Sequence, residues 1–432
     1  MTSSPDSPGA ADIPGADPSR AADNSGAADS PRTYPRVLGH FSTGRPGPTI
    51  VVTGGVHGNE PAGCEALRSV LALLAREALP LRGELWAVAG NLRALAANRR
   101  YIDRDLNRRW IREDIARIVA NGPEDAVEDH EQLELLAVLA PLLERSQTPI
   151  VFLDLHSTSG PSTPFVCMAD VLRNRKIALA LGIPVVLGLE EVLDGSLLDY
   201  LCDLGHIGVA VEAGQHVDPI TVHYHESAVW LTLAAAGALD EPHLATVARA
   251  RGTGFFAARD PGVPAVVEIR HRHVVLPAHE PFVMLPGFAN FQPIARGQLV
   301  AHDSRGPVHA PFAGIMMLPR YQGLGDDGFF IARAVSPLAL HVSSALRRLH
   351  LDRVVPLLPG IRRHPRLADH FIADPNIARS HVVDVFHLFG YRHVRNLGEG
   401  LVFSRRVPGG PLLRRPEFAT MVARASTPRS AP

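Results

Sequence analysis

Short apolar runs rich in β-branched residues alternate with longer amphipathic stretches between residues 33 and 245. A short run that ends at glycine or proline indicates a strand, and apolar residues recurring every three to four positions indicate a helix. This alternation predicts one α/β domain, a sheet covered by helices. Strands are expected at 49–53, 84–89, 150–155, 164–168 and 207–212, and helices at 61–76, 128–145, 171–181 and 221–238.

The pattern changes after this domain. Residues 263–338 contain short apolar runs separated by Pro and Gly, which predicts a small all-β domain. Residues 339–432 begin with a helical pattern and end in a strand-like run, and we expect a C-terminal extension to which the sequence assigns no role. Residues 1–32 hold Met1 and Ile13 as their only large apolar residues, so a disordered tail without a secretory signal is expected.

Composition narrows the class of protein. The chain has 432 residues, of which 46% are hydrophobic, and 43 Lys and Arg face 44 Asp and Glu, a formal net charge of -1. No global positive field exists to hold a nucleic acid or an anionic membrane, and no apolar window is long enough to span a bilayer. The three cysteines form no CxxC pair, which fits a reducing compartment. We therefore expect a soluble cytoplasmic protein. The sequence leaves open whether it forms a homo-oligomer.

Two predicted strands end in residues that can bind a metal. The first is followed by a loop that carries His57 and Glu60, three positions apart, and the strand at 150–155 runs directly into His156. Open α/β sheets place their sites at the carboxyl ends of strands, so these side chains meet if the two strands are neighbours. Two histidines and one glutamate, with a fourth position left for water, are the ligands of a hydrolytic zinc site.

Further polar residues are expected at the same edge. The strand at 207–212 ends in Glu212, a carboxylate that the metal does not need and that can act as general base. The polar loop at 100–108 carries Arg100 and Arg108, which can stabilise an oxyanion and bind a substrate carboxylate. In the same loop, Asp103 and Asp105 are ambiguous: one can orient an arginine or a ligand histidine, while the other only caps the turn.

Four motifs resemble the succinylglutamate desuccinylase and aspartoacylase family of the zinc carboxypeptidase clan, and they occur in family order. They are GxHGNExxG at 55–63, RYIDRDLNR at 100–108, DLHSTSG at 154–160 and VEAGQ at 211–215. The resemblance covers about residues 48–335, because a small β domain is also expected there. It implies a zinc-carboxypeptidase-like mixed sheet flanked by helices.

The resemblance also implies a role for each matching residue. One Zn²⁺ per chain is held by His57, Glu60 and His156, zinc-bound water is the nucleophile and Glu212 is the base. Arg100 polarises the scissile carbonyl. The substrate carboxylate is bound by Asn107 and Arg108, and the family tyrosine of the β domain corresponds to Tyr321. The expected activity is removal of an acyl group from an N-acyl amino acid or a similar small amide.

The chain departs from the aspartoacylase branch, which carries a further substrate arginine shortly before the catalytic glutamate. No Lys or Arg occurs between Lys176 and Arg249. We expect a neutral pocket wall there, built by residues such as Leu201, Cys202 and Leu204, and a neutral or monoacidic substrate. Arginines of the β domain, for example Arg296 or Arg320, are the alternative source of a cation.

Two other functions fit the same ligands. A metallocarboxypeptidase would cut a peptide with this metal site, and only the pocket shape separates it from a deacylase. A catalytically silent zinc-binding module is the third hypothesis. The presence of Glu212 and Arg100 argues against silence, because loss of the base would be the simplest inactivating change.

Overall fold

The computed structural model describes residues 33–256, 260–275, 281–365, 370–374, 381–391, 393–396 and 401–404, with a few positions between 412 and 422. The tail expected at 1–32 lies outside the described residues. The strands up to residue 334 are β1 (Val37–Ser42), β2 (Arg45–Gly54), β3 (Arg82–Ala89), β4 (Val151–Thr158), β5 (Phe165–Cys167), β6 (Val185–Leu187), β7 (Ile207–Gln215), β8 (Val266–Val274), β9 (Phe282–Met284), β10 (Pro293–Ile294), β11 (Leu299–Asp303), β12 (Gly306–His309), β13 (Gly314–Met317) and β14 (Asp327–Ala334).

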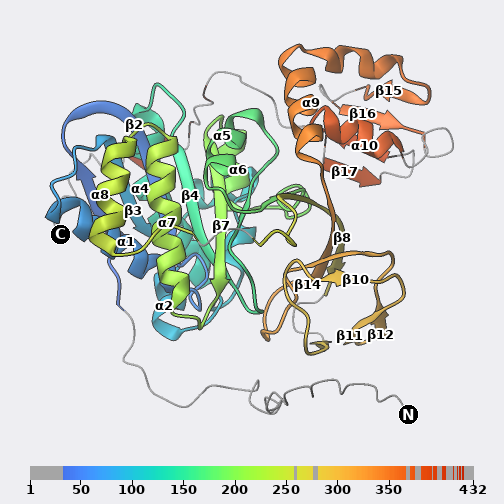
Figure 1. Ribbon diagram of the computed structural model, residues 1–432, viewed down its shortest axis with the longest axis horizontal. Coiled ribbons are helices and arrows are strands. Elements are labelled where there is room, and N and C mark those ends of the chain that lie inside the picture. The colour runs from blue at the N-terminus through green and yellow to red at the C-terminus, as the bar shows by residue number, and fades with distance from the viewer. Residues whose placement is uncertain are drawn as a thin grey trace, which may run out of the picture. The chain divides into compact units, whose positions relative to one another are not determined.

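Eleven of these strands form one mixed sheet in the order β1-β3-β2-β4-β7-β5-β6-β8-β14-β13-β10 (Figure 1). The strands β3, β2, β4 and β7 are parallel neighbours at its centre. The expected strands and helices are all present, with bounds that differ by at most four residues from the prediction. The mixed α/β fold is therefore confirmed.

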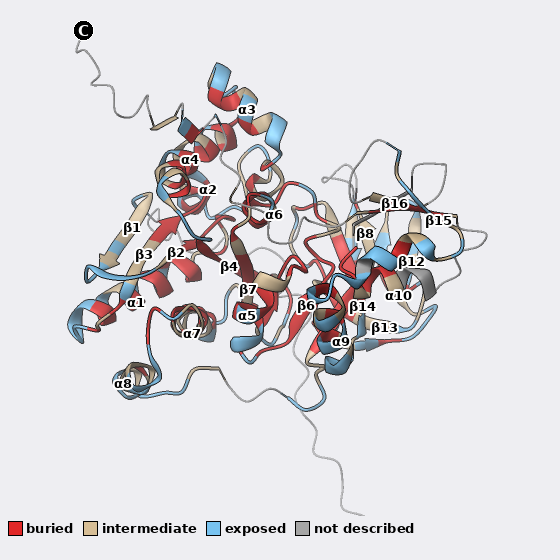
Figure 2. Ribbon diagram, turned by 90° about the horizontal axis from the view of Figure 1, so that it is seen from above, coloured by how far each residue is buried: buried red, intermediate tan, exposed pale blue. Residues whose placement is uncertain are grey.

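Helices cover both faces of the sheet. In Figure 2, α1, α5 and α7 lie on one side of the central strands, and α4 and α6 lie on the other. None of the helices that the structure describes is long and apolar enough to cross a membrane. The helices of this region are α1 (Ala62–Arg76), α2 (Leu92–Ala97), η2 (Leu106–Arg108, a 3-10 turn), α3 (Arg112–Asn121), α4 (Val127–Arg145), α5 (Leu172–Ala180), α6 (Leu197–Asp203), α7 (Ile220–Ala235) and α8 (Glu241–Arg251).

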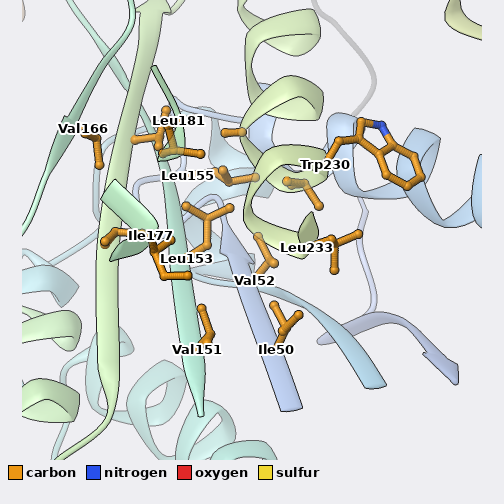
Figure 3. Packing of buried hydrophobic residues seen from close by; sticks show 14 of the residues in the cluster. Ile50, Val52, Val151, Leu153, Leu155, Val166, Ile177, Leu181, Trp230 and Leu233 are labelled. Atoms are coloured by element: carbon orange, nitrogen blue, oxygen red, sulfur yellow. The ribbon is translucent and has the colours of Figure 1, made fainter. Parts of the chain in front are cut away.

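The core follows the alternation of side chains along the strands. Ile50 and Val52 of β2 pack with Leu153 of β4 in the cluster that includes α1 and α7 (Figure 3). Val51 and Phe152 point to the opposite face and pack with α3 and α4. Each such buried side chain contributes about 1.5 to 3 kcal/mol through removal from water. The two packed faces hold the central strands, and hence their carboxyl ends, in a fixed register.

Four strands of the β segment at 263–338 extend the main sheet. Its strand β8 pairs in parallel with β6, and β14, β13 and β10 continue the sheet in antiparallel order. Only β12, β11 and β9 form a separate three-stranded sheet. A sequence pattern shows that a segment is a strand but not which strand it pairs with, so this extension of the main sheet was not predicted.

The C-terminal extension contains a second antiparallel sheet, in the order β15-β16-β18-β17. Its first helix packs against the α/β region: Arg175 of α5 forms an ion pair with Asp170 at 2.7 Å and donates a hydrogen bond to the carbonyl of Leu340 at 3.0 Å. The expected helical start and late strand are confirmed. The elements are α9 (Pro337–Arg348), η3 (Leu351–Leu357), β15 (Ile361–Arg363), β16 (His370–Ala373), α10 (His381–Leu388), β17 (His393–Asn396) and β18 (Leu401–Ser404).

Candidate functional site

The predicted metal and base residues lie on three adjacent strands of the main sheet. The loop after β2 carries His57 and Glu60, while β4 carries His156 and β7 carries Glu212. In the register of β4 and β7, His156 and Glu212 are directly opposite each other. The condition on which the metal prediction depended, that β2 and β4 are neighbours, is confirmed.

Glycines allow the loop after β2 to pack tightly. Gly55 has a φ of +69°, a left-handed conformation that favours glycine. A Cβ on Gly58 would lie 2.0 Å from the carbonyl carbon of Ala94, so no larger residue fits. The N–H of Gly58 also donates to the carbonyl of Arg100 at 3.1 Å. The loop after β2 and the loop at 100–108, called the arginine loop below, are therefore fixed to each other by backbone contacts.

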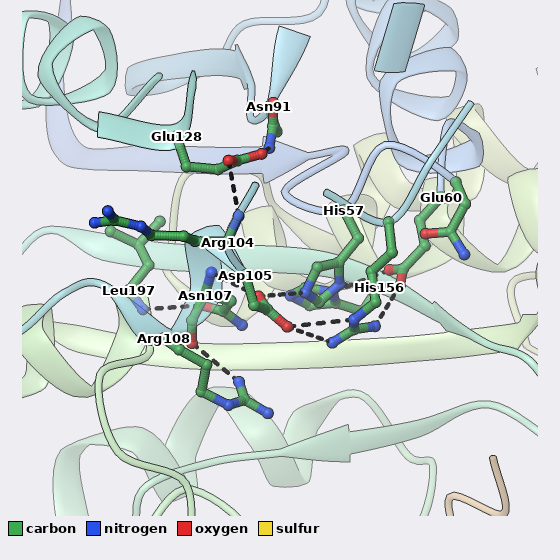
Figure 4. Close-up of polar contacts among 12 residues, drawn as sticks. His57, Glu60, Asn91, Arg104, Asp105, Asn107, Arg108, Glu128, His156 and Leu197 are labelled. Carbon is green, nitrogen blue, oxygen red and sulfur yellow. Dashed lines mark hydrogen bonds and ion pairs between the residues drawn. The ribbon is translucent and has the colours of Figure 1, made fainter. Parts of the chain in front are cut away.

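His57, Glu60 and His156 form a buried group, called the metal group below. Their candidate ligand atoms all lie within 4.8 Å of one another. The Nδ1 atom of His57 is 3.0 Å from Glu60 Oε1, and the Nδ1 atom of His156 is 3.0 Å from Glu60 Oε2 (Figure 4). Imidazole nitrogens and a carboxylate oxygen are ligand types that zinc prefers. The residues present therefore fit a metal ion.

A second carboxylate holds the far side of each imidazole. The Nε2 atom of His57 is 3.1 Å from Asp105 Oδ1, and the Nε2 atom of His156 is 2.9 Å from Asp154 Oδ2. Thr53 donates to the other oxygen of Asp154 at 2.6 Å. Carboxylates in this position orient the imidazole rings of metal ligands. Both rings thus present Nδ1 toward Glu60, as a shared metal would require.

The electrostatic surroundings of His57, Glu60 and His156 favour a bound cation. Burial disfavours an ionised carboxylate, but His57 and a hydrogen bond from His156 hold the pKa of Glu60 well below its usual range. Burial also disfavours a charged His156, yet Asp154 and Glu60 keep the pKa of that imidazole well above its usual range. The same carboxylates that stabilise an imidazolium favour a bound metal ion.

Arg100 lies beside the metal group. Its Nη2 donates to Asp105 Oδ2 at 2.9 Å, and its Nη1 lies 3.7 Å from Glu60 Oε1. Burial opposes the charge, but Asp105 and Glu60 raise the pKa of Arg100 above its usual value. In the same loop, Asn107 accepts a hydrogen bond at Oδ1 from the N–H of Leu197 at the start of α6, at 3.0 Å. Asp105 therefore links Arg100 to His57.

Glu128 supports the arginine loop, and the sequence analysis did not single it out. This fully buried carboxylate accepts hydrogen bonds from the backbone N–H groups of residues 102–104 at 2.7, 3.0 and 3.0 Å, and from Asn91 at 3.0 Å (Figure 4). Asp103 in turn accepts from the N–H of Val127 at 2.8 Å, as the turn-capping alternative for that residue proposed. The only sequence signal for Glu128 was its position in the acidic first turn of α4.

Glu212 carries an unused carboxylate oxygen into the site. Its Oε2 atom is shielded from solvent and has no hydrogen-bond partner among the described residues. Burial raises the pKa of Glu212 to about 8, with a further contribution from Glu60, while His156 and Arg100 act in the opposite direction. A buried carboxylate with a raised pKa and a free oxygen is suited to accept a proton.

One cavity of about 120 Å³ brings the predicted residues together. It is lined by the metal group, by Glu212 and by the arginine loop. Loops after β4, β6 and β13 complete it. The main lining residues are His57, Glu60, Arg100, Asn107, Arg108, Asp154, His156, Ser157, Cys167, Leu189, Glu190, Leu193, Leu198, Glu212, His216, Arg320, Gln322, Asp326, Asp327 and Phe330.

Tyr321 is the predicted site residue that the structure does not bring to this cavity. Its side chain is 37% exposed, and its hydroxyl lies 3.0 Å from the carbonyls of Leu285 and Phe288, to which it can donate. The same oxygen accepts from the N–H of Phe288 at 3.0 Å. Backbone groups of the β segment therefore take up the hydrogen bonds of the Tyr321 hydroxyl. The prediction that Tyr321 binds substrate finds no support.

The pocket wall before Glu212 also differs from the expectation. Leu201, Cys202 and Leu204 are buried in the protein core and do not line the cavity. The loop after β6 lines it instead, and this loop includes the acidic residue Glu190. The wall is therefore not neutral. The prediction failed because the sequence locates the segment but not the face of α6 that meets the cavity.

The structure adds two polar residues to which the sequence analysis assigned no role. Ser157 Oγ lies 2.7 Å from His216 Nδ1, and both residues line the cavity. The N–H of Ser157 donates to Glu60 Oε2 at 3.1 Å, which fixes the third member of the metal group. A usable signal existed, since Ser157 directly follows a predicted ligand and His216 comes four residues after Glu212.

The sequence is similar to known deacylases. The family model of the succinylglutamate desuccinylase/aspartoacylase catalytic domain matches residues 46–235. A probable aspartoacylase of Parasynechococcus marenigrum is 31% identical over 222 residues, which cover 47% of this chain and 68% of the relative. A succinylglutamate desuccinylase of Photorhabdus laumondii is 45% identical over 60 residues, and this match spans 14% of the chain and only 18% of that relative's length.

Solved structures of similar proteins align with a larger part of the chain. The product-bound ectoine utilization protein EutE (DoeB) of Ruegeria pomeroyi is 20% identical, with a TM-score of 0.48, and the alignment covers 68% of this chain and 87% of that protein. A succinylglutamate desuccinylase of Vibrio cholerae is 17% identical, with the same TM-score, over 68% of this chain and 83% of that one.

Proposed function

The chain belongs to the succinylglutamate desuccinylase and aspartoacylase family, and we propose that it is a zinc-dependent amidohydrolase that removes the acyl group from an N-acyl amino acid. One observation carries the proposal: a buried His-Glu-His group, a carboxylate with a raised pKa and a guanidinium share one cavity.

His57, Glu60 and His156 would hold the zinc ion. When bound, zinc would supply Lewis acidity and a lowered pKa for water at the site. Asp105 and Asp154 would accept the Nε2–H groups of the two imidazoles and orient the rings, so that Nδ1 of each faces the zinc site. These contacts support the ligand assignment independently of the motifs.

Glu212 would act as general base at its unbonded Oε2. It would take a proton from the attacking water, whose oxygen forms a bond to the acyl carbon. The same proton would then pass to the amide nitrogen as the carbon–nitrogen bond breaks, so that the products are a carboxylic acid and a free amine. Arg100, held by Asp105, would donate hydrogen bonds to the oxyanion that forms on the former carbonyl oxygen.

Asn107 and Arg108 would bind the carboxylate of the amino acid. Because Asn107 uses Oδ1 to accept from Leu197, its Nδ2 group is the donor left for a substrate. Arg108 lines the cavity and its Nη2 donates to Asp327 Oδ2 at 3.0 Å, which orients the guanidinium. A planar guanidinium binds a carboxylate through two parallel hydrogen bonds.

A hydrolysis screen tests the proposal. The zinc-loaded protein is incubated with N-acetyl, N-formyl and N-succinyl amino acids and with short peptides, and release of free amine is measured. We expect hydrolysis of at least one N-acyl amino acid, with loss of activity on chelation and in the His156→Ala variant. Cleavage of peptides alone would identify a carboxypeptidase instead, and turnover of neither class by metal-loaded protein would favour a binding module.

A further inference from the structure

The loop between β6 and α6, residues 188–196, forms one wall of the cavity and is called the cavity loop below. Leu189, Glu190 and Leu193 are among its residues that line the cavity. The loop is closed by its own backbone, because the N–H groups of Val192 and Leu193 both donate to the carbonyl of Leu189 at 3.1 Å. Groups that hold this loop from outside the cavity therefore influence the shape of the substrate site.

Glu191 connects the cavity loop to a buried carboxylate outside the cavity lining. Its Oε1 atom accepts a hydrogen bond from the N–H of Asp170 at 2.9 Å. Asp170 is buried and follows β5. Its Oδ1 atom accepts from Nε and Nη2 of Arg175 at 3.0 and 2.7 Å, which fixes the carboxylate to α5. Asp170 is therefore a point at which the cavity loop is attached to the rest of the α/β region.

The C-terminal extension reaches the same aspartate through Arg347 of α9. The Nη2 group of Arg347 donates to the main-chain carbonyl of Asp170 at 2.6 Å, and its Nη1 lies 3.3 Å from Asp170 Oδ1. A Cβ on Gly390 would lie 2.6 Å from the guanidinium carbon, so glycine leaves room for this side chain. Arg347 thus contacts both the main chain and the side chain of the residue whose N–H binds Glu191.

A second contact of the extension lies near the start of the cavity loop. His387 of α10 has its Nδ1 atom 2.7 Å from Oε1 of Glu268, a buried carboxylate of β8. The loop begins beside this carboxylate, since a Cβ on Gly188 would lie 3.7 Å from Glu268 Cγ. The extension therefore contacts residues that hold the cavity loop at two places, next to Gly188 and next to Glu191.

The extension is attached to the α/β region by other contacts besides Arg347. Leu340 of α9 belongs to the main hydrophobic core, and its carbonyl accepts from Arg175 Nη1 at 3.0 Å. Arg175 Nη2 also donates to Ser343 Oγ at 3.1 Å. Replacement of Arg347 therefore leaves α9 docked and Asp170 paired with Arg175. An effect on the cavity loop can thus be measured in a folded protein.

We propose that the C-terminal extension positions the cavity loop, and that Arg347 is a positioning residue that acts on substrate binding through Asp170 and Glu191. The inference rests on the proposed function, in which the cavity binds an N-acyl amino acid. It gives a role to a segment that lies beyond the matched family region, residues 46–235. Loss of the restraint of one hydrogen bond predicts about two- to tenfold weaker substrate binding.

Amide hydrogen exchange and steady-state kinetics of the full, zinc-loaded chain test this role. Arg347→Met removes the hydrogen bond and the charge but keeps a long side chain, whereas Arg347→Lys keeps the charge. Arg348→Met is the matched control, because Arg348 is an exposed arginine of the same helix. Exchange is followed without ligand in peptides that cover residues 188–196. The values of KM and kcat are measured for the N-acyl amino acid that is hydrolysed fastest in the screen above.

We expect exchange of the cavity loop to be about two- to tenfold faster in Arg347→Met, with a rise in KM of the same order. Zinc content should be unchanged, and kcat should stay within a few-fold of wild type. Arg347→Lys should be intermediate, and Arg348→Met should behave like wild type. A merely structural role would lower the melting temperature without changing KM or the exchange of this loop.

A double-mutant cycle tests the path from the extension to the loop. Glu191→Ala breaks the contact on the loop side and should have the same effect as Arg347→Met. The double variant should add little to either single variant, because both act through one chain of contacts. Unchanged loop exchange in folded Arg347→Met, or additive effects in the double variant, would overturn the inference. If Arg347→Met does not fold, unchanged loop exchange in Arg347→Lys would overturn it in the same way. If no N-acyl amino acid is hydrolysed, the proposed function fails, and the exchange data still decide whether the extension positions the loop.

Discussion

Replacement of Glu212 by glutamine separates catalysis from binding and folding. The amide has the shape of the carboxylate but cannot accept a proton from water. In the structure, Glu212 Oε2 makes no hydrogen bond among the described residues, so the substitution breaks no protein contact at that atom. The His57–Glu60–His156 group does not include Glu212, and we therefore expect zinc content to be unchanged.

The expected loss comes from the chemical step alone. A positioned general base contributes about 10²- to 10⁴-fold to the rate, which corresponds to about 3 to 5 kcal/mol of transition-state stabilisation. Burial raises the pKa of Glu212 to about 8, which makes its carboxylate a stronger base than that of an exposed glutamate. The kcat of Glu212→Gln should thus fall into this range, whereas KM should change little.

The assay is steady-state release of amine from the best N-acyl amino acid, with metal content and melting temperature measured on the same samples. Glu190→Gln is the matched control, since Glu190 is also a carboxylate of the cavity but accepts a hydrogen bond from Ser196 at 2.8 Å. We expect its kcat to stay within a few-fold of wild type. If Glu212→Gln turned over at a near-normal rate with normal zinc content, the proton would be accepted elsewhere and this assignment would be wrong.

Three further predictions follow from named contacts. Arg100→Ala should chiefly lower kcat, because Arg100 faces a developing charge, whereas Arg108→Ala should chiefly raise KM, because its partner is charged throughout the reaction; steady-state kinetics separates the two. Asp105→Asn should weaken zinc binding by about 10- to 100-fold in competition with a chelator, because Asp105 orients His57. His206→Asn should reduce the acid sensitivity of unfolding between pH 7 and pH 5 by about 2 kcal/mol, measured by urea unfolding.

The sign of the last effect follows from the buried imidazole. Burial lowers the pKa of His206 to about 4, with Arg173 acting in the same direction, while the unfolded chain has a value near 6.5. The contribution to stability is complete above pH 6.5 and is lost as the pH falls toward 4. His206 Nδ1 accepts the N–H of Ile150 at 3.1 Å, and the side-chain oxygen of Asn can accept in its place without titrating.

Each of these predictions has a control or a contrary outcome. Identical kinetic profiles for Arg100→Ala and Arg108→Ala would refute the division of labour. Asp103→Asn controls for Asp105→Asn, since Asp103 contacts the backbone of Val127 and not a metal ligand. The idea about His206 fails if the wild type and His206→Asn lose the same free energy of unfolding between pH 7 and pH 5.

The sequence predicted those features that depend on local pattern. The alternation of strands and helices located the central elements, and motif residues at strand ends located His57, Glu60, His156 and Glu212 before their partners were visible. Strand ends are informative because parallel strands bring residues far apart in the chain to one edge.

Features that depend on long-range pairing were not predictable in the same way. The sequence marked β8 as a strand but could not show that it pairs with β6, so the extension of the main sheet by the β segment was not predicted. Tyr321 was chosen by motif alone, whereas its neighbour Arg320 lines the cavity because of the path of the loop between β13 and β14. Glu128 supports the arginine loop from another helix, and nothing in its local sequence indicates which backbone groups it binds.

Zinc content per chain tests the central claim most directly. Purified wild-type protein, loaded with zinc and freed of excess metal, should contain one zinc ion per chain by elemental analysis. The His57→Ala and His156→Ala variants should lose it while a control with an exposed histidine replaced, His302→Ala, should retain it. Stoichiometric zinc in folded His57→Ala or His156→Ala protein would contradict the assignment of the metal group and the deacylase mechanism built on it.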